Sequence, residues 1–201
     1  MRRVSRGDDW LGRIQNRLAE VIDGPADDTH LSAAERRQAA ALMRINHAGE
    51  VAAQGLYLGQ AAQAKRADNR EHLLEAAAEE KAHLRWCRAR LDRLGSAPSL
   101  LDPIWFAGSY TLGASVARLG DAISLGFVSE TERQVEAHLE GHLQRLPAGD
   151  HASREVLEKM RDDEAAHGAA ARERGGRELP RPVRKLMALS SKVMTTSAYW
   201  I

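Results

Sequence analysis

The chain has 201 residues, enough for one domain with a full-sized core, and its formal net charge of +1 argues against nucleic acid as the main partner. Alanine occupies 34 positions and leucine 23, whereas valine, isoleucine and threonine together number 20, so the composition favours a mostly helical fold over a sheet. The single cysteine, Cys87, excludes an internal disulfide framework and favours a reducing compartment.

No segment predicts a transmembrane helix. The N-terminal residues MRRVSRGDDW carry charges throughout and lack the apolar core of a secretory signal. The longest uncharged run, Pro103–Ala117, has 15 residues, fewer than the roughly 18 to 20 that span a bilayer. The sequence therefore argues against a membrane-spanning protein and leaves contact with a membrane surface open.

Hydrophobic periodicity and turn residues divide the chain into successive segments. Residues 1–30 are expected to form an N-terminal amphipathic arm. The first long helix is expected to begin after Ser32, where Glu35 completes a capping box, and to end near Ala67. The second is expected over residues 69–94.

The second half of the chain begins with a segment, 103–146, that is too long for one ordinary helix. Four glycines interrupt it: Gly108, Gly113, Gly120 and Gly126. A further helix is expected over 153–174, followed by a C-terminal amphipathic stretch, 177–201. Residues 31–176 therefore predict a four-helix bundle with one long crossover between its second and third helices, as one all-α domain with short amphipathic arms.

Two of these helices carry a Glu-x-x-His pattern on a face that is otherwise apolar. Glu80 lies in the middle of the apolar stripe of the second helix, and His83 follows three residues later on the same face. Glu164 and His167 repeat this spacing on the last helix of the bundle. A single Glu-x-x-His pair could arise by chance, but here the pattern occurs in both halves of the chain.

The other two helices each place one glutamate in an apolar stripe, Glu50 in the first and Glu132 in the third. A carboxylate that faces a dry core costs several kcal/mol unless it is paired or bound to a metal. The stripes contain no Lys or Arg that could pair with these glutamates. Two divalent cations would neutralise the four negative charges.

A Glu from each of two helices plus a Glu-x-x-His from each of the other two is the ligand set of ferritin-like di-iron proteins. Nitrogen and oxygen ligands without a thiolate favour iron or manganese over a structural zinc site. The predicted ligands are Glu50, Glu80, His83, Glu132, Glu164 and His167. In such sites the two Glu-x-x-His glutamates bridge the metals, so that Glu50 would complete the half-site of His83 and Glu132 that of His167.

Several neighbouring residues allow two interpretations. Glu79 and Asp163 are either solvated charges or groups that orient a ligand histidine. Glu130 and Glu136 are expected to be solvated. His47, in the Asn-His-Ala-Gly-Glu run, is expected to be structural.

His138 and His142 lie four residues apart, a spacing that also suits zinc. Polar neighbours on the same face favour a surface location for both. The functional alternative puts His138 near the mouth of a cavity beside the metals.

Four motifs of the chain resemble the demethoxyubiquinone hydroxylases. They are LMRINHAGE at residues 42–50, LYLGQ at 56–60, EEKAH at 79–83 and RDDEAAH at 161–167. Glu132 falls where the third-helix glutamate of the family is expected. The resemblance extends from about Ala39 to the C-terminus, and the His-Ala-Gly-Glu run makes it specific. Asn46 stands where other members carry Asp, a difference not expected to disturb a ligand.

The resemblance implies an O₂-dependent di-iron monooxygenase of ubiquinone biosynthesis. Its substrate would be a polyprenylated demethoxy-benzoquinol, whose ring receives one oxygen atom while the other leaves as water. The implied cofactors are two iron ions, with O₂ as co-substrate and an external reductant such as NADH.

The substrate also explains two unusual segments. The crossover is apolar and rich in small residues, as expected either for a closely packed buried helix or for a channel that receives the polyprenyl tail. The C-terminal stretch places Leu186 and Val193 beside Arg184 and Lys192, as in an interfacial helix on anionic lipid or in an ordinary core helix with a solvated basic face. We therefore expect a peripheral protein on the cytoplasmic side of the cell membrane.

Other partners follow from the same expectation: a lipid-binding protein of ubiquinone biosynthesis and a second copy of the chain, but no nucleic acid. One alternative function is a di-iron hydroxylase of another substrate, such as a modified tRNA base. Another is a non-catalytic iron-binding protein, which would favour a soluble, cage-forming surface.

Overall fold

The computed structural model describes residues 30–201, and this part of the chain is helical with no strand. Its helices are α2 (Ala33–Gln63), α3 (Ala67–Arg93), α4 (Asp102–Arg118), α5 (Asp121–Arg145), α6 (His151–Glu173) and α7 (Arg181–Trp200). The amphipathic arm predicted over residues 1–30 lies, apart from His30, outside the described residues.

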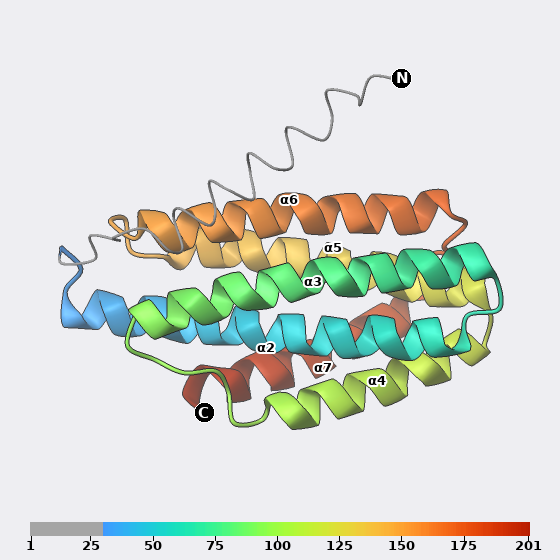
Figure 1. Ribbon diagram of the computed structural model, residues 1–201, viewed down its shortest axis with the longest axis horizontal. Coiled ribbons are helices and arrows are strands. Elements are labelled where there is room, and N and C mark those ends of the chain that lie inside the picture. The colour runs from blue at the N-terminus through green and yellow to red at the C-terminus, as the bar shows by residue number, and fades with distance from the viewer. Residues whose placement is uncertain (1–29) are drawn as a thin grey trace, which may run out of the picture.

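Helices α2, α3, α5 and α6 form the predicted four-helix bundle (Figure 1). α2 packs along α3, α5 packs along α6, and the two pairs meet through α2–α5 and α3–α6 contacts. α4 is the crossover between α3 and α5, and both α4 and α7 lie against α2 on the same side of the bundle (Figure 1). The prediction of an all-α, ferritin-like bundle with one long crossover is confirmed.

The capping box at the start of α2 forms as predicted. The Ser32 backbone N–H donates to Glu35 Oε2 at 2.9 Å, and the Glu35 N–H donates to Ser32 Oγ at 3.3 Å. These two bonds satisfy backbone donors that the first helical turn leaves without partners. α2 then ends at Gln63, four residues before the predicted Ala67.

The long segment that follows α3 consists of two helices, and its chain breaks only at Gly120. Gly120 has a φ of 114°, a conformation that L side chains rarely adopt, and it separates α4 from α5. The other three glycines, Gly108, Gly113 and Gly126, lie inside helices. The prediction of four interruptions was therefore wrong at three positions.

Two of the helical glycines let the backbones of α2 and α4 approach each other closely. A Cβ added at Gly113 would lie 2.2 Å from the Leu56 carbonyl oxygen, and one at Gly59 would lie 2.1 Å from that of Tyr110. Real Cβ atoms essentially never come so near to backbone oxygens. The small residues of the crossover therefore serve close helix packing, one of the two interpretations of this segment.

Two large apolar clusters fill the interior of the bundle, and two smaller ones lie where α4 and α7 pack against it. The first, at the end of the bundle where α2 begins, is centred on Leu42, Met43, Cys87, Leu91, Leu139, Leu143, Val156, Leu157 and Met160. The second, towards the other end, contains Tyr57, Ala61, Leu73, Ala76, Ala77, Leu125, Val128 and Ala171. On every helix of the bundle the predicted ligands fall between these two clusters in the sequence, so apolar side chains close the site from both ends.

A buried ion pair joins the end of α3 to the start of α6. Arg90 Nη2 donates to Asp150 Oδ1 at 2.9 Å, and Arg90 Nε donates to Ser153 Oγ at 2.8 Å. Asp150 also accepts from the Ser153 N–H at 2.9 Å as the N-cap of α6. The apolar periodicity did not predict this pair, because a charged residue on a helix face is ordinarily solvated.

None of the helices within residues 30–201 combines the length and the apolar character needed to cross a bilayer.

Replacing Gly113 by Ala should destabilise the protein, because the new methyl group would press on the backbone of α2. The expected loss is about 1–3 kcal/mol in the free energy of unfolding, measured by urea denaturation. Gly108→Ala, on the same helix but with nothing within 4 Å of the added Cβ, is the matched control and should be neutral or slightly stabilising. Equal effects of the two substitutions would show that the close approach of α2 and α4 is unimportant.

Candidate metal centre

The structure brings all six predicted ligands together in the middle of the bundle. Each of the four bundle helices contributes at least one of them, and all are buried. They form two overlapping groups whose potential ligand atoms lie within 4.8 Å of one another: Glu50, Glu80, His83 and Glu164 in one group, and Glu132, Glu164 and His167 in the other. This division agrees with the predicted half-sites, in which Glu50 accompanies His83 and Glu132 accompanies His167.

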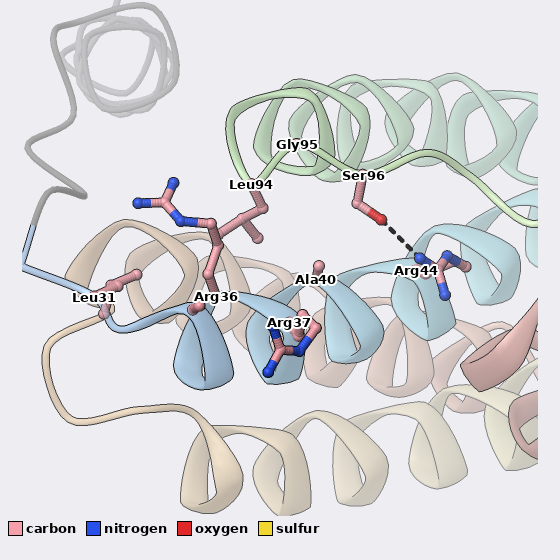
Figure 2. A pocket seen from close by; sticks show the side chains of 9 residues that line it. Leu31, Arg36, Arg37, Ala40, Arg44, Leu94, Gly95 and Ser96 are labelled. Carbon is pink, nitrogen blue, oxygen red and sulfur yellow. Dashed lines mark hydrogen bonds between the residues drawn. The ribbon is translucent and has the colours of Figure 1, made fainter.

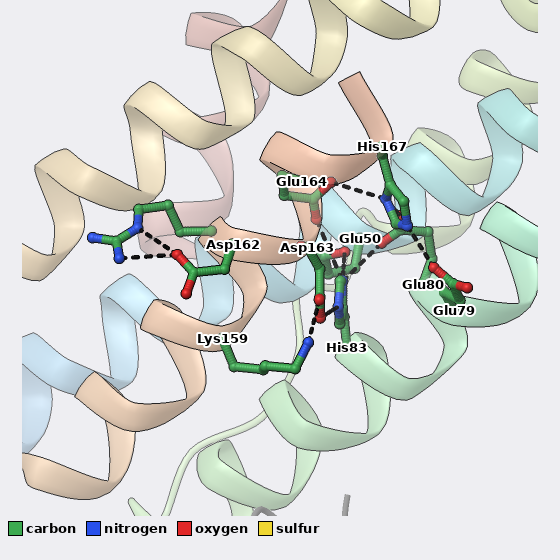
Figure 3. A network of polar contacts seen from close by, with 10 residues as sticks. Glu50, Glu79, Glu80, His83, Lys159, Asp162, Asp163, Glu164 and His167 are labelled. Carbon is green, nitrogen blue, oxygen red and sulfur yellow. Dashed lines mark hydrogen bonds and ion pairs between the residues drawn. The ribbon is translucent and has the colours of Figure 1, made fainter. Parts of the chain in front are cut away.

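Glu80 and Glu164 each direct one oxygen toward each histidine (Figure 3). Glu80 Oε2 lies 3.0 Å from His83 Nδ1, and its Oε1 lies 3.3 Å from His167 Nδ1. Glu164 Oε1 lies 3.4 Å from His83 Nδ1, and its Oε2 lies 3.5 Å from His167 Nδ1. A carboxylate placed in this way can bridge two metal ions, one beside each histidine.

The outer nitrogen of each histidine contacts an acid on the opposite helix (Figure 3). His83 Nε2, on α3, lies 3.2 Å from Asp163 Oδ2 of α6, and His167 Nε2, on α6, lies 2.6 Å from Glu79 Oε2 of α3. A proton held on Nε2 by such a bond leaves the Nδ1 lone pair directed inward for a metal ion. Of the two interpretations of Glu79 and Asp163, the structure therefore supports the one in which they orient the histidines.

The pKa values of the four central glutamates are shifted in two directions. Burial acts to raise all four, and contacts with histidines lower two of them. Burial raises the pKa of Glu50, reinforced by the neighbouring Glu80 carboxylate, and it raises the pKa of Glu132, reinforced by Glu164. Burial acts in the same sense on Glu80 and Glu164, but their contacts with His167 and His83 outweigh it and hold both pKa values below the ordinary range.

The two histidines show the complementary shift. Burial opposes the charged ring, but for His83 the contacts with Asp163 and Glu164 prevail and raise its pKa well above the ordinary value. For His167, Glu164 and Glu79 raise the pKa to about 12. Without a metal, these shifts favour the protonated forms of Glu50, Glu132 and both histidines and the charged forms of Glu80 and Glu164. Two divalent ions could replace these protons and balance the charge of the four carboxylates.

Several buried oxygens of the cluster form no hydrogen bond of good geometry, which is the feature that fits a metal. They are both carboxylate oxygens of Glu132, together with Glu50 Oε2 and Glu80 Oε1, which lie 3.4 and 3.3 Å from the Nδ1 atoms of His83 and His167. A buried polar atom without a partner costs about 1–3 kcal/mol. The donor set of carboxylate oxygens and imidazole nitrogens suits iron or manganese, so the residues present fit a dinuclear centre of this kind.

The predicted surface location of His142 is wrong. His142 is buried, and its Nδ1 lies 2.8 Å from Asn46 Oδ1 on α2, while its ring lies 3.9 Å from that of His138. Burial, together with His138, lowers the pKa of His142 to about 3, and burial with Arg145 lowers that of His138 to about 4. The sequence interpretation failed because α2 and α7 cover a face of α5 that is polar in composition.

His138 lines a small cavity beside Glu50, as its functional alternative proposed. The cavity has a volume of about 40 Å³ and lies between α2, α5 and α7. Its polar lining includes Asn46, Gln134 and Thr195. The side-chain atoms Asn46 Nδ2, His138 Nε2 and His142 Nε2 are buried there or nearby without a hydrogen-bond partner.

Two other expectations concern the residues around Glu132 and Glu50. Glu130 is buried rather than solvated, because Arg133 and Gln134 donate to its carboxylate at 2.7 Å each. Glu136 is exposed, as predicted. His47 plays the structural part expected of it, with Nδ1 2.9 Å from Asp102 Oδ2 at the start of α4.

A larger open cavity, of about 480 Å³, lies where α2 begins and α3 ends (Figure 2). Arg36, Arg37 and Arg44 line it, and none of the six clustered ligands does. Arg44 donates to Ser96 Oγ at 2.7 Å and to the Tyr199 carbonyl oxygen at 3.1 Å. Arg44 therefore connects α2 to the loop after α3 and to the end of α7.

Replacing His142 by Gln should make stability less dependent on pH. Folded His142 stays neutral down to about pH 3, whereas the ring in the unfolded chain takes up a proton at about pH 6.5. Below that pH, each further pH unit of acidification therefore lowers the free energy of unfolding by at most about 1.4 kcal/mol. The glutamine keeps an N–H for Asn46 but cannot titrate. Urea denaturation between pH 7 and pH 4.5 should therefore give a shallower slope for the variant than for the wild type.

The matched control for this prediction is His151→Gln, at an exposed histidine on α6. A wild-type slope in His142→Gln, or the same change of slope in the control, would contradict the assignment of this pH dependence to the buried ring.

Comparison with known proteins shows the family of the chain. The family model described as "Ubiquinone biosynthesis protein COQ7" matches residues 37–198. A protein of Cupriavidus taiwanensis is 56% identical over 94% of this chain and 92% of its own length, and one of Variovorax paradoxus is 60% identical over 83% and 80%. A third, of Burkholderia cenocepacia, is 52% identical over 92% and 90%, and all three are named 3-demethoxyubiquinol 3-hydroxylase. The chain therefore belongs to the COQ7 family of ubiquinone biosynthesis proteins.

Proposed function

We propose that this chain is a 3-demethoxyubiquinol 3-hydroxylase that uses O₂ and two iron ions. One observation carries the proposal: a two-fold arrangement of two histidines and four carboxylates, buried in a chain that is 52–60% identical to proteins of that name. Glu80 and Glu164 would bridge the ions, His83 and Glu50 would hold one of them, and His167 and Glu132 the other.

When bound, reduced iron supplies the electrons and the open coordination positions that O₂ activation requires, with an external reductant such as NADH restoring them. The protein supplies geometry and exclusion of water. Asp163 and Glu79 keep each histidine in the tautomer that presents Nδ1 to the metal. The two apolar clusters on either side of the site keep bulk water away from it.

The small cavity beside Glu50 is the proposed entry for the substrate ring. Its polar groups, including Asn46 Nδ2 and His138 Nε2, have no partner within the described residues and could bind the oxygen substituents of a quinol. At about 40 Å³ it is smaller than the cavity of about 150 Å³ that holds benzene in an engineered protein. Ser191, Met194 and Thr195 of α7 form its outer wall, so α7 would have to move to admit a ring.

The proposed location is the cytoplasmic surface of the cell membrane. α7 has a single buried residue, Ala198, and exposes Leu186, Leu189, Val193 and Trp200 by 58–77%. Basic side chains accompany these apolar ones on the same helix, as in interfacial helices that bind anionic lipid. α4, on the same side of the bundle (Figure 1), exposes Ile104 and Leu112, and Leu119 directly after it is exposed as well.

This surface favours a lipid-linked substrate over the alternatives of a tRNA base or iron storage. A lipid-binding accessory protein and a second copy of the chain remain predicted partners of the same apolar face.

Glu132→Ala should lose one of two bound irons and most of the hydroxylase activity, because Glu132 is the terminal carboxylate of one half-site. Replacing a residue that only supports a ligand typically lowers metal affinity about 10–100-fold, and loss of a ligand itself is expected to lower it at least as much. Iron content is measured by elemental analysis. Activity is measured by expressing the chain in bacteria that accumulate demethoxyubiquinone and analysing their lipids by mass spectrometry.

The matched control is Glu136→Ala, at an exposed glutamate four residues later on α5, which should keep two irons and full conversion. Wild-type chain that is loaded with iron but converts no demethoxyubiquinone under air would refute the proposed substrate. Two irons and full activity in Glu132→Ala would refute the ligand assignment on α5.

The double substitution Leu186→Glu and Leu189→Glu should weaken binding to lipid vesicles without unfolding the bundle, because both side chains are more than half exposed. Co-sedimentation with vesicles should show wild-type binding that is stronger on phosphatidylglycerol than on neutral phosphatidylcholine. Leu74→Glu, at an exposed leucine of α3, is the control and should bind as the wild type does. No difference between the double variant and the control would argue against α7 as the contact surface.

A further inference from the structure

The two Glu-x-x-His motifs belong to a longer repeat that includes the acids outside the histidines. In each case an acidic residue directly precedes the bridging glutamate: Glu79 before Glu80, and Asp163 before Glu164. Each of these acids holds the histidine of the opposite helix. The arrangement around the two proposed metal positions is therefore nearly two-fold symmetric in residue type and in contact.

The symmetry breaks one helical turn before these acids. Lys159 lies four residues before Asp163 on α6, and its Nζ donates to Asp163 Oδ1 (Figure 3). The corresponding residue on α3, four before Glu79, is Glu75. The same place in the repeat thus carries a positive charge in one half and a negative charge in the other.

The surroundings of the two acids differ in the same sense. The side chains of Asp163 and Lys159 are 27% and 18% exposed, so their ion pair is partly shielded from solvent. The Glu79 side chain is 64% exposed, and within residues 30–201 its carboxylate is paired with His167 and with no lysine or arginine. A shielded ion pair retains more of its electrostatic effect than an exposed one.

We propose that Lys159 and Glu75 make the two half-sites electronically unequal, so that the metal ion beside His167 has the lower reduction potential. This inference rests on the proposed di-iron centre. Lys159 acts as a positioning residue through Asp163 and His83, and it touches neither a metal nor the substrate.

Two effects of the charges point in the same direction. Lys159 draws electron density from the Asp163 carboxylate, which makes Asp163 a weaker acceptor for the His83 N–H and makes His83 a less electron-rich ligand. Its positive charge also disfavours the loss of an electron from the nearby ion. On the other side, no lysine or arginine of the described residues pairs with Glu79 to weaken it as an acceptor for His167, and the negative charge of Glu75 favours the higher oxidation state.

The experiment is an anaerobic titration of the protein loaded with two ferrous ions. Ferricyanide accepts one electron from each ion as Fe²⁺ becomes Fe³⁺. Mössbauer spectroscopy with ⁵⁷Fe follows the two ions separately and gives two apparent potentials. Three variants are compared with the wild type: Lys159→Met, Glu75→Lys and Lys81→Met. Lys81 is an exposed lysine of α3 that makes no pair with Asp163 or Glu79, so it controls for the loss of one positive charge.

The wild type should show two distinct potentials. Lys159→Met should lower the upper one and leave the lower one in place, because it removes the cation beside the His83 half-site. Glu75→Lys should raise the lower one and leave the upper one in place. Both variants therefore reduce the difference between the two potentials, one by lowering the upper potential and the other by raising the lower one. Lys81→Met should leave the difference unchanged.

The proposal is overturned if Lys159→Met and Glu75→Lys move the same potential, if either moves both equally, or if Lys81→Met has the same effect as Lys159→Met. Lys159→Arg keeps the cation and should restore the wild-type upper potential, which distinguishes a charge effect from damage to α6. Wild-type protein that fails to bind two irons would overturn the di-iron centre and this inference with it. Two irons with unequal potentials but no hydroxylation would refute the substrate alone.

Discussion

Burying four carboxylates between two apolar clusters is the constraint on which the rest of this structure depends. Glu50, Glu80, Glu132 and Glu164 each lie on a different helix of the bundle, and each is at most 2% exposed. Their charge has to be neutralised by protons and imidazolium rings or by metal ions. Both Glu132 oxygens lack a hydrogen-bond partner among the described residues, a position that a metal ion could fill.

The two buried histidines make the position of α3 relative to α6 part of the site. His83 is held from α6 by Asp163, and His167 is held from α3 by Glu79. A shift of one helix would therefore disturb both half-sites together. The Arg90–Asp150 pair fixes the same two helices at the end of the bundle, where its shielded contact and the N-cap of α6 resist sliding. Structure far from the proposed metal positions thus contributes to the geometry of the residues around them.

The remaining helices connect this interior to the outside. α4 approaches α2 closely through Gly59 and Gly113, and it exposes Ile104, Tyr110 and Leu112 on its outer face. α7 walls the cavity beside Glu50 with one face and exposes leucine and valine on the other. Under the proposed function, a helix that both covers the entry and presents an apolar surface would link binding of a lipid-linked substrate to access to the site.

Much of the fold and most of the site were predictable from the sequence, because each rests on periodicity within a helix. An i, i+3 pair such as Glu80 and His83 shares a helix face whatever the tertiary fold. A glutamate within an apolar stripe is recognisable because burying an unpaired carboxylate would cost free energy. The same reasoning located the α2 capping box at Ser32. Lys159 could also have been found from its spacing to Asp163, had the two motifs been extended by one turn.

Only the tertiary structure could decide features that depend on which helix covers which face. Gly113 predicts a helix interruption from its residue type alone. It lies inside α4 instead, because it packs against the backbone of α2, a contact that no neighbouring residue in the sequence indicates. His142 seemed exposed because its own helix face is polar, yet α2 supplies Asn46 to bury it. The sequence by itself determined an all-α bundle with six metal-ligand candidates, since these follow from local periodicity and charge. The pairing of each histidine with an acid from the opposite helix was decided by tertiary structure, because contacts between distant segments depend on how the helices pack.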